Sequence, residues 1–279
     1  MAFNIIENGG RTLWMQGDGA STYYKGQIVM LSTNATTECD GTCTPLSVPS
    51  GAADTTQLNI PFGIIVGFNK RTPTTTTLGT LLVEYDGGAC VTQAAQLARE
   101  FTGQEGMYGK ADPSILIQVA EINSLSILRG PVYNAAYGTA PTLLTSTAVG
   151  GTDGMVTADT TNACDFTNVT KCGTIYCRAG ANMGLYRVSK DTSTTAPSVT
   201  TAFPYDTAIG DQYVRVPFKQ GNSNIYIAGP GMYVDCSKNP VIAATNLYNV
   251  VVYKMDLSTA GREYVDFRFG GDHFCRFRA

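Results

Sequence analysis

The side chains that could do chemistry in this chain are few and far apart. His273 is the only histidine, so a Ser–His–Asp or Cys–His site would have to use a residue close to the end of the sequence. Asp272 beside it would point to the opposite side of a strand and could not orient the imidazole ring. The sequence contains no Gly-x-Ser-x-Gly, phosphate-loop or dinucleotide motif. We therefore expect no catalytic residue, no cofactor and no enzyme activity.

The eight cysteines are the remaining candidates for metal ligands. Cys39 with Cys43, and Cys172 with Cys177, are spaced closely enough for small disulfide loops or for two halves of a zinc site. Reduced thiols, disulfides formed after assembly, and zinc all stay open as interpretations. We favour reduced thiols and expect no metal site, because zinc would require two distant pairs of thiolates to converge.

The composition excludes several classes of protein. The 279 residues include 19 Lys and Arg against 22 Asp and Glu, and 43% are hydrophobic. This balance is wrong for a disordered chain, and it lacks the positive excess that binding to nucleic acid requires. No apolar run approaches the roughly 20 residues of a membrane helix, and the start shows no secretory signal. We expect a weakly charged protein that is made in a cytoplasm and contacts neither nucleic acid nor membrane.

Short strands separated by turn residues dominate the sequence. The segments rich in β-branched and aromatic residues are 23–31, 62–68, 81–85, 89–91, 115–122, 125–128, 174–177, 184–189, 212–218, 225–228, 232–236, 247–255 and 264–269. One short helix is expected over 93–101. The pattern predicts an all-β fold with two β-barrel or β-sandwich domains of short antiparallel strands and at most one or two short helices.

We place the domain boundary near residue 133, where a Gly-, Ala- and Thr-rich segment of weak periodicity begins. The prediction is an N-terminal β-barrel over 1–132 and a C-terminal β-sandwich over 133–279. The strand 264–269 alternates, so Val265, Phe267 and Phe269 should face inward and Asp266 and Arg268 outward.

The end of the chain carries an unusual mixture of arginine and phenylalanine. Protein interfaces are enriched in arginine and aromatic residues and depleted in lysine and glutamate. We interpret the residues beyond Gly270-Gly271 as an arm that pairs with, or is held against, a neighbouring subunit. The predicted interface residues are Trp14, Arg268, Phe274, Arg276, Phe277 and Arg278.

Three segments of the first half resemble a known family. They are Lys-Gly-Gln-Ile-Val at 25–29, Pro-Phe-Gly-Ile-Ile-Val-Gly-Phe at 61–68, and Leu-Leu-Val-Glu-Tyr-Asp-Gly-Gly-Ala-Cys-Val at 81–91. In this order they resemble the head-decoration proteins of tailed phages, which are small capsid-associated β-barrels. The resemblance spans roughly residues 20–130 and carries no catalytic residue.

The resemblance implies a structural protein on the exterior of a virion. It would bind the major capsid protein and copies of itself, as a trimer, and stabilise the lattice after assembly in the host cytoplasm. Because this chain is longer than typical decoration proteins, a second β domain would be added for outward display or for contacts between capsomers.

Other functions stay open at this point. The chain could be a jelly-roll major capsid protein or a tail or fibre component, or more distantly a surface carbohydrate-binding β module. The usual tailed-phage shell fold is disfavoured because it needs a long helix that the sequence does not predict. A sugar-binding cleft usually needs several exposed aromatic residues, and Trp14 is the only tryptophan.

The arm can be tested by deleting residues 274–279. We expect association with particles or with other copies to weaken by about tenfold, because arginine and aromatic side chains contribute most to interfaces. Association is measured by sedimentation, with circular dichroism as the control for folding. An unchanged association constant with an unchanged spectrum would contradict the interpretation.

Overall fold

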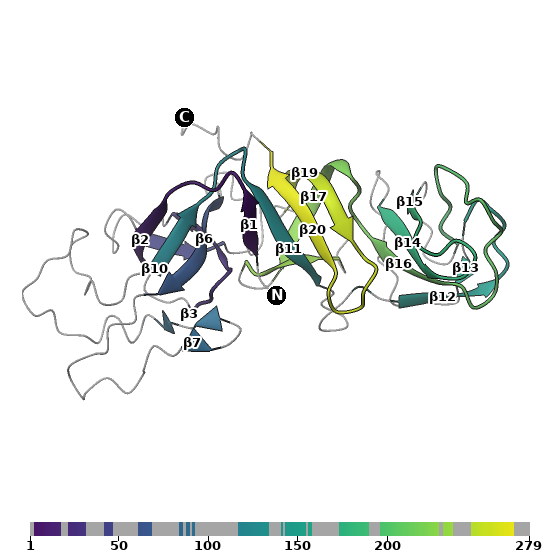
Figure 1. Cartoon of the computed structure of the whole chain (residues 1–279), viewed down its shortest axis with the longest axis horizontal. Coiled ribbons are helices and arrows are strands. Elements are labelled where there is room, and N and C mark those ends of the chain that lie inside the picture. The colour runs from purple at the N-terminus through teal and green to yellow at the C-terminus, as the bar shows by residue number, and fades with distance from the viewer. Residues whose placement is uncertain are drawn as a thin grey trace, which may run out of the picture. The chain divides into compact units, whose positions relative to one another are not determined.

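We describe the fold from a computed structural model of the chain (Figure 1). The residues described are 3–17, 22–31, 42–46, 61–68, 84–85, 88–89, 91–92, 117–133, 141, 143–154, 156–157, 173–189, 196–228, 231–236 and 247–270. Their regular structure consists of strands β1 to β20, without a helix, which confirms the predicted all-β class. The helix expected over 93–101 lies outside these residues. Within the described part, nothing has the length and apolar character of a membrane-spanning helix.

The described residues form two compact units, and each is described by itself. One unit takes in residues up to 128 together with 231 and 232, and the other takes in 129–228 and 233–270. The division into domains 1–132 and 133–279 remains a prediction about which segments fold independently.

A closed five-stranded barrel forms the centre of the first unit. Its strands follow the order β10 (Ile117–Glu121), β2 (Thr12–Gly17), β5 (Thr42–Pro45), β4 (Ile28–Leu31), β6 (Pro61–Phe68). The other strands of this unit are β1 (Asn4–Glu7), β3 (Thr22–Tyr23), β7 (Glu84–Tyr85), β8 (Gly88–Ala89) and β9 (Val91–Thr92). Alternate residues face the interior, where Met15, Val29, Cys43, Ile65, Ile117 and Val119 pack together.

Close approach of β6 and β10 depends on a glycine. A Cβ atom at Gly63 would lie 2.4 Å from Cγ1 of Val119 and 2.6 Å from the carbonyl oxygen of Ala120. No other residue type therefore fits the paired strands at this position.

The second unit contains two sheets. In the first, five strands lie side by side in the order β11 (Ile127–Tyr133), β18 (Tyr233–Asp235), β17 (Gly221–Ala228), β19 (Leu247–Asp256), β20 (Tyr264–Phe269), and β20 also pairs with β11. Pairing between the first and last strands leaves this sheet without a free edge along β20 and β11. Most strand pairs among the described residues are antiparallel as predicted, but β11 with β18 and β2 with β5 are parallel.

Strand β20 confirms most of the predicted alternation. Val265, Phe267 and Phe269 are fully buried. Asp266 is also buried, contrary to its predicted outward position, because Arg129 covers it. The guanidinium of Arg129 donates two hydrogen bonds of 2.7 and 2.8 Å to the carboxylate and lies 4.0 Å from the ring centre of Tyr264.

The other sheet of the second unit has the order β13 (Val156–Thr157), β12 (Leu143–Ala148), β16 (Gln212–Val216), β14 (Thr174–Ala179), β15 (Tyr186–Val188). Its core is formed by Leu144, Ile175, Cys177, Val199, Phe203 and Tyr213. Two isolated bridges, Ser189 with Val199 and Gly154 with Ser198, link the two sides of this sheet.

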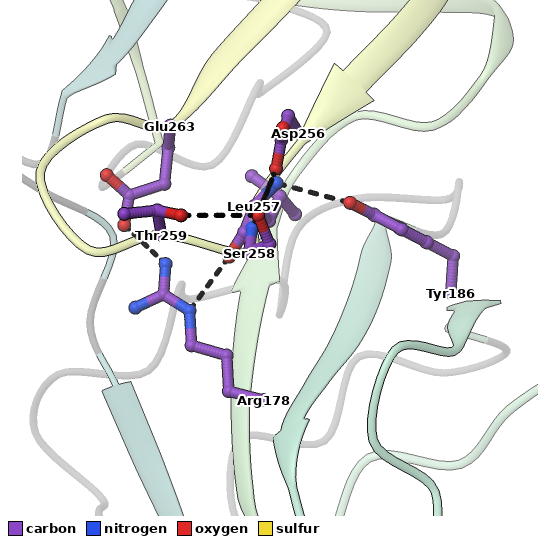
Figure 2. Close-up of polar contacts among 7 residues, drawn as sticks. All are labelled: Arg178, Tyr186, Asp256, Leu257, Ser258, Thr259 and Glu263. Carbon is purple, nitrogen blue, oxygen red and sulfur yellow. Dashed lines mark hydrogen bonds and ion pairs between the residues drawn. The ribbon is translucent and has the colours of Figure 1, made fainter.

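A network of polar contacts joins the two sheets of the second unit (Figure 2). Arg178, at the end of β14, forms an ion pair with Glu263 and donates a hydrogen bond of 2.8 Å to the carbonyl oxygen of Leu257. Tyr186, at the start of β15, accepts a hydrogen bond of 3.2 Å from the amide of Leu257. Both residues thus hold the turn between β19 and β20.

The same turn is also organised internally. The amide and hydroxyl of Ser258 donate hydrogen bonds of 2.9 and 2.6 Å to the carboxylate of Asp256. These bonds stabilise the ionised carboxylate and lower the pKa of Asp256 below its usual value. The turn therefore presents Leu257 and Glu263 to Arg178 in a fixed conformation.

Substitution of Arg178 by methionine tests the ion pair. Glu263 is 1% exposed, so its charge would be left buried without a partner, and we expect a loss of about 3 to 5 kcal/mol in unfolding free energy. The double variant R178M/E263M should recover most of the loss, because neither charge is then buried.

The matched control is Arg11→Met, which breaks the exposed Arg11–Glu121 pair at 3.5 Å and should cost less than about 1 kcal/mol. The measurement is urea unfolding at neutral pH followed by circular dichroism. Equal losses for R178M and R11M would show that the buried pair has no special structural role.

Candidate interaction surface

Three connecting segments of the second sheet in the second unit meet at one place. They are residues 149–154 between β12 and β13, residues 180–185 between β14 and β15, and residues 200–211 before β16. We call these three segments the loop cluster. Two buried polar residues, Asn182 and Thr207, hydrogen-bond the third segment to the other two, and a third buried residue, Asp211, forms its bond within the third segment.

Thr207 connects the third segment to the first. Its amide donates a hydrogen bond of 2.9 Å to the carbonyl oxygen of Gly151, and its own carbonyl accepts one of 3.2 Å from Gly150. Its hydroxyl donates to the carbonyl oxygen of Gly154 at 2.8 Å. Further along, the amide of Phe203 donates to the carbonyl oxygen of Thr152 at 2.8 Å. The two segments are therefore paired over most of their length.

Asn182 connects the second segment to the third. Its side-chain amide donates a hydrogen bond of 2.9 Å to the carbonyl oxygen of Tyr205 and accepts one of 3.3 Å from the Tyr205 amide. Because both polar groups of this buried side chain are satisfied by one residue, the position of Tyr205 is tightly specified.

Asp211 closes the third segment and lies against Gly180 of the second. Its carboxylate accepts a hydrogen bond of 2.9 Å from the amide of Ala208. Gly180 has φ of +103°, and a Cβ atom there would lie 2.0 Å from Oδ1 of Asp211. Only glycine combines this backbone conformation with room for the carboxylate.

The loop cluster carries four large apolar side chains that are exposed to solvent. The exposed fractions are 65% for Val149, 68% for Met183, 60% for Tyr205 and 70% for Ile209. Single exposed apolar residues are common, but these four lie on loops that hydrogen bonds join, which makes the loop cluster a candidate interaction surface. Because these loops are already ordered, binding would cost little conformational entropy.

Cys177 lies on β14, two residues before the strand ends, and belongs to the core of the sheet that carries the loop cluster. Its backbone accepts a hydrogen bond from Gly184 and donates one to Leu185. Burial, with the nearby charge of Asp211, raises the pKa of the Cys177 thiol to about 12. The thiol is therefore protonated at neutral pH, as in a packed structural cysteine, and is neither a nucleophile nor a thiolate ligand in this state.

The structure describes two of the predicted interface residues. Trp14 is 40% exposed on the outside of the barrel, opposite Gln118. Arg268 is half-buried on β20, opposite Val251, and its guanidinium lies 5.9 Å from the ring centre of Tyr253. The two belong to different units, and their role in an interface stays a prediction. Phe274, Arg276, Phe277 and Arg278 lie outside the described residues, as do His273 and Asp272.

The metal candidates are only partly described. Cys43, Cys177 and Cys236 are buried, and Cys39 and Cys172 lie outside the described residues. In the portion of the chain that the structure covers, no three His, Cys, Asp or Glu side chains are placed to hold a metal ion.

Sequence reasoning missed the loop cluster as a surface. The four exposed apolar residues are too far apart in sequence to suggest one surface. One signal was available in the sequence, because each of the three segments contains an apolar residue followed directly by glycine. These pairs are Val149-Gly150, Met183-Gly184 and Ile209-Gly210, and they indicate turns with an exposed hydrophobic residue.

Comparison with known proteins identifies no relative. No protein-family model, no curated protein and no solved structure matches the chain.

Substitution of Gly180 by alanine tests the close packing that positions the loops. The clash with Asp211 adds to the backbone strain, so we expect a loss of about 3 kcal/mol or more in unfolding free energy. Gly184→Ala is the matched control, because Gly184 has φ of +88° and open space around its Cβ position. Backbone strain alone should cost it about 1 kcal/mol. Equal losses of unfolding free energy for the two variants, measured by urea unfolding, would mean that the close packing of Asp211 against Gly180 contributes nothing to stability.

Proposed function

We propose that this chain is a non-enzymatic structural protein of a virion. It binds the capsid surface, contacts the major capsid protein and further copies of itself, and stabilises the lattice as a decoration or cement protein. The observation that carries the proposal is the loop cluster, because ordered loops with Val149, Met183, Tyr205 and Ile209 exposed are suited to permanent contact with another protein.

Two further features support the proposal. Only 15% of the residues are charged, so the surface has little of the ionic character that keeps isolated proteins apart in solution. The barrel of the first unit is closed, and β20 pairs with β11 in the second, so a partner strand cannot be added along these strands. Contacts at the barrel or along β20 and β11 would then be made by side chains and loops, whereas β13 and β15 remain edge strands of the other sheet.

The mechanism is the summed burial of apolar surface at many equivalent positions. Each apolar square ångström removed from water contributes about 25 cal/mol, before the cost of association. Repeated over a lattice, modest contacts of this kind resist expansion of a pressurised shell without any covalent bond.

The proposal is tested on particles purified from the source of the gene. Electron microscopy should locate the chain on the outside of the capsid, and purified protein should rebind stoichiometrically to particles from which it has been stripped. Location of the chain within the shell or on a tail, or failure to rebind, would contradict the proposal.

The role of the loop cluster is tested in the same rebinding assay with the variant M183S/I209S. Removal of two exposed apolar side chains should weaken rebinding by about tenfold or more, because each buried side chain contributes on the order of 1 to 2 kcal/mol. Leu143→Ser is the matched control, since Leu143 is exposed on β12 outside the loop cluster and should leave rebinding unchanged. If M183S/I209S and L143S weakened rebinding equally, the loop cluster would not be part of the contact.

A further inference from the structure

We propose that the loop cluster of one copy binds the C-terminal segment, residues 271–279, of a second copy. This inference rests on the proposed function only in taking the loop cluster as a protein-binding surface. It adds the identity of one occupant, which is the chain itself.

The loop cluster exposes apolar side chains, and the charged residues of its own three segments are all acidic. Its three segments contain no lysine or arginine, and their three acids are Asp153, Asp206 and Asp211. Asp211 is buried and bonded to Ala208, whereas Asp153 and Asp206 are exposed. The surface therefore fits a partner that is both apolar and basic.

Arg187 contacts the third segment but forms no ion pair with the exposed aspartates. Arg187 on β15 donates hydrogen bonds to the carbonyl oxygens of Tyr186 and Ala202, and its guanidinium lies 5.5 Å from the ring centre of Phe203. Its donors are thus directed at the protein's own backbone, and the exposed aspartates remain available to a second molecule.

The C-terminal segment has the complementary chemistry. Its sequence is Gly-Asp-His-Phe-Cys-Arg-Phe-Arg-Ala, in which Phe274 and Phe277 are the apolar residues and Arg276 and Arg278 the cations. Arginine and aromatic side chains are the types that contribute most to interfaces. The two phenylalanines would pack on the exposed apolar residues, and the two arginines would pair with Asp153 and Asp206.

The course of β20 favours a second copy over the chain's own loop cluster. Glu263, just before β20, is bonded to Arg178, which lies two residues from Gly180 of the loop cluster. From there β20 runs six residues, about 20 Å, before the segment begins. Nine residues span at most about 30 Å, so a return along β20 to its own loop cluster would use most of the segment's length.

Charge reversal with the full-length purified chain tests this contact. We expect the wild type to self-associate in sedimentation equilibrium without any capsid present. The loop variant D153K/D206K and the arm variant R276E/R278E should each associate about tenfold or more weakly, because like charges then face each other. A mixture of the two variants should recover association, because each loop cluster then meets an arm of opposite charge.

Glu7→Lys is the control, since Glu7 is an exposed acid of β1 outside the loop cluster and its reversal should leave association unchanged. Circular dichroism verifies that every variant is folded. A strictly monomeric wild type, single variants that associate normally, or a mixture that recovers nothing would each overturn the inference. Because no particle is present, none of these results depends on whether the chain binds a capsid.

Discussion

The ion pair between Arg178 and Glu263 is the contact on which the arrangement of the second unit depends. It joins the end of strand β14 to the turn between β19 and β20, and Arg178 also donates a hydrogen bond to the carbonyl oxygen of Leu257. A buried ion pair contributes little net stability, because both charges must leave water. Its effect is on specificity, since any arrangement that separates the two residues leaves a buried charge without a partner. Together with Tyr186, the pair fixes the β14–β15 hairpin against the other sheet.

The loop cluster is built on that hairpin. Its second segment connects β14 to β15, and Asn182 bonds this segment to the third. Thr207 bonds the third segment to the first, and Asp211 bonds Ala208 within the third segment. The buried polar residues satisfy the backbone of irregular loops, which would otherwise need water. Apolar side chains can then be exposed on loops that are already ordered, and this combination connects the internal polar network to a surface suited to permanent contacts.

Closure of the sheets determines where partners can bind. In the first unit the barrel strands satisfy one another's backbone groups, and in the second β20 returns to β11. Strand addition, one of the two modes expected for the C-terminal arm, is therefore restricted to other edges, such as β13 and β15 of the second sheet. Contact through side chains and charge is the mode that we propose for the loop cluster, with its exposed aspartates and the arginines of the arm as the paired groups.

The sequence by itself determined the fold class and most strands, because alternation and turn residues are local signals. The strand at 264–269 has the bounds predicted for it, and the strand predicted at 62–68 begins one residue earlier, at Pro61. The strands at Thr42–Pro45 and Leu143–Ala148 were not predicted, because their polar and threonine-rich sequences acquire strand structure only by pairing with distant segments. Burial of Asp266 was likewise decided by tertiary structure, since only the fold places Arg129 above it. The loop cluster belongs to the same category, because its apolar residues come from three separate segments. Local sequence encodes which residues turn and which extend, whereas long-range pairing decides which turns meet.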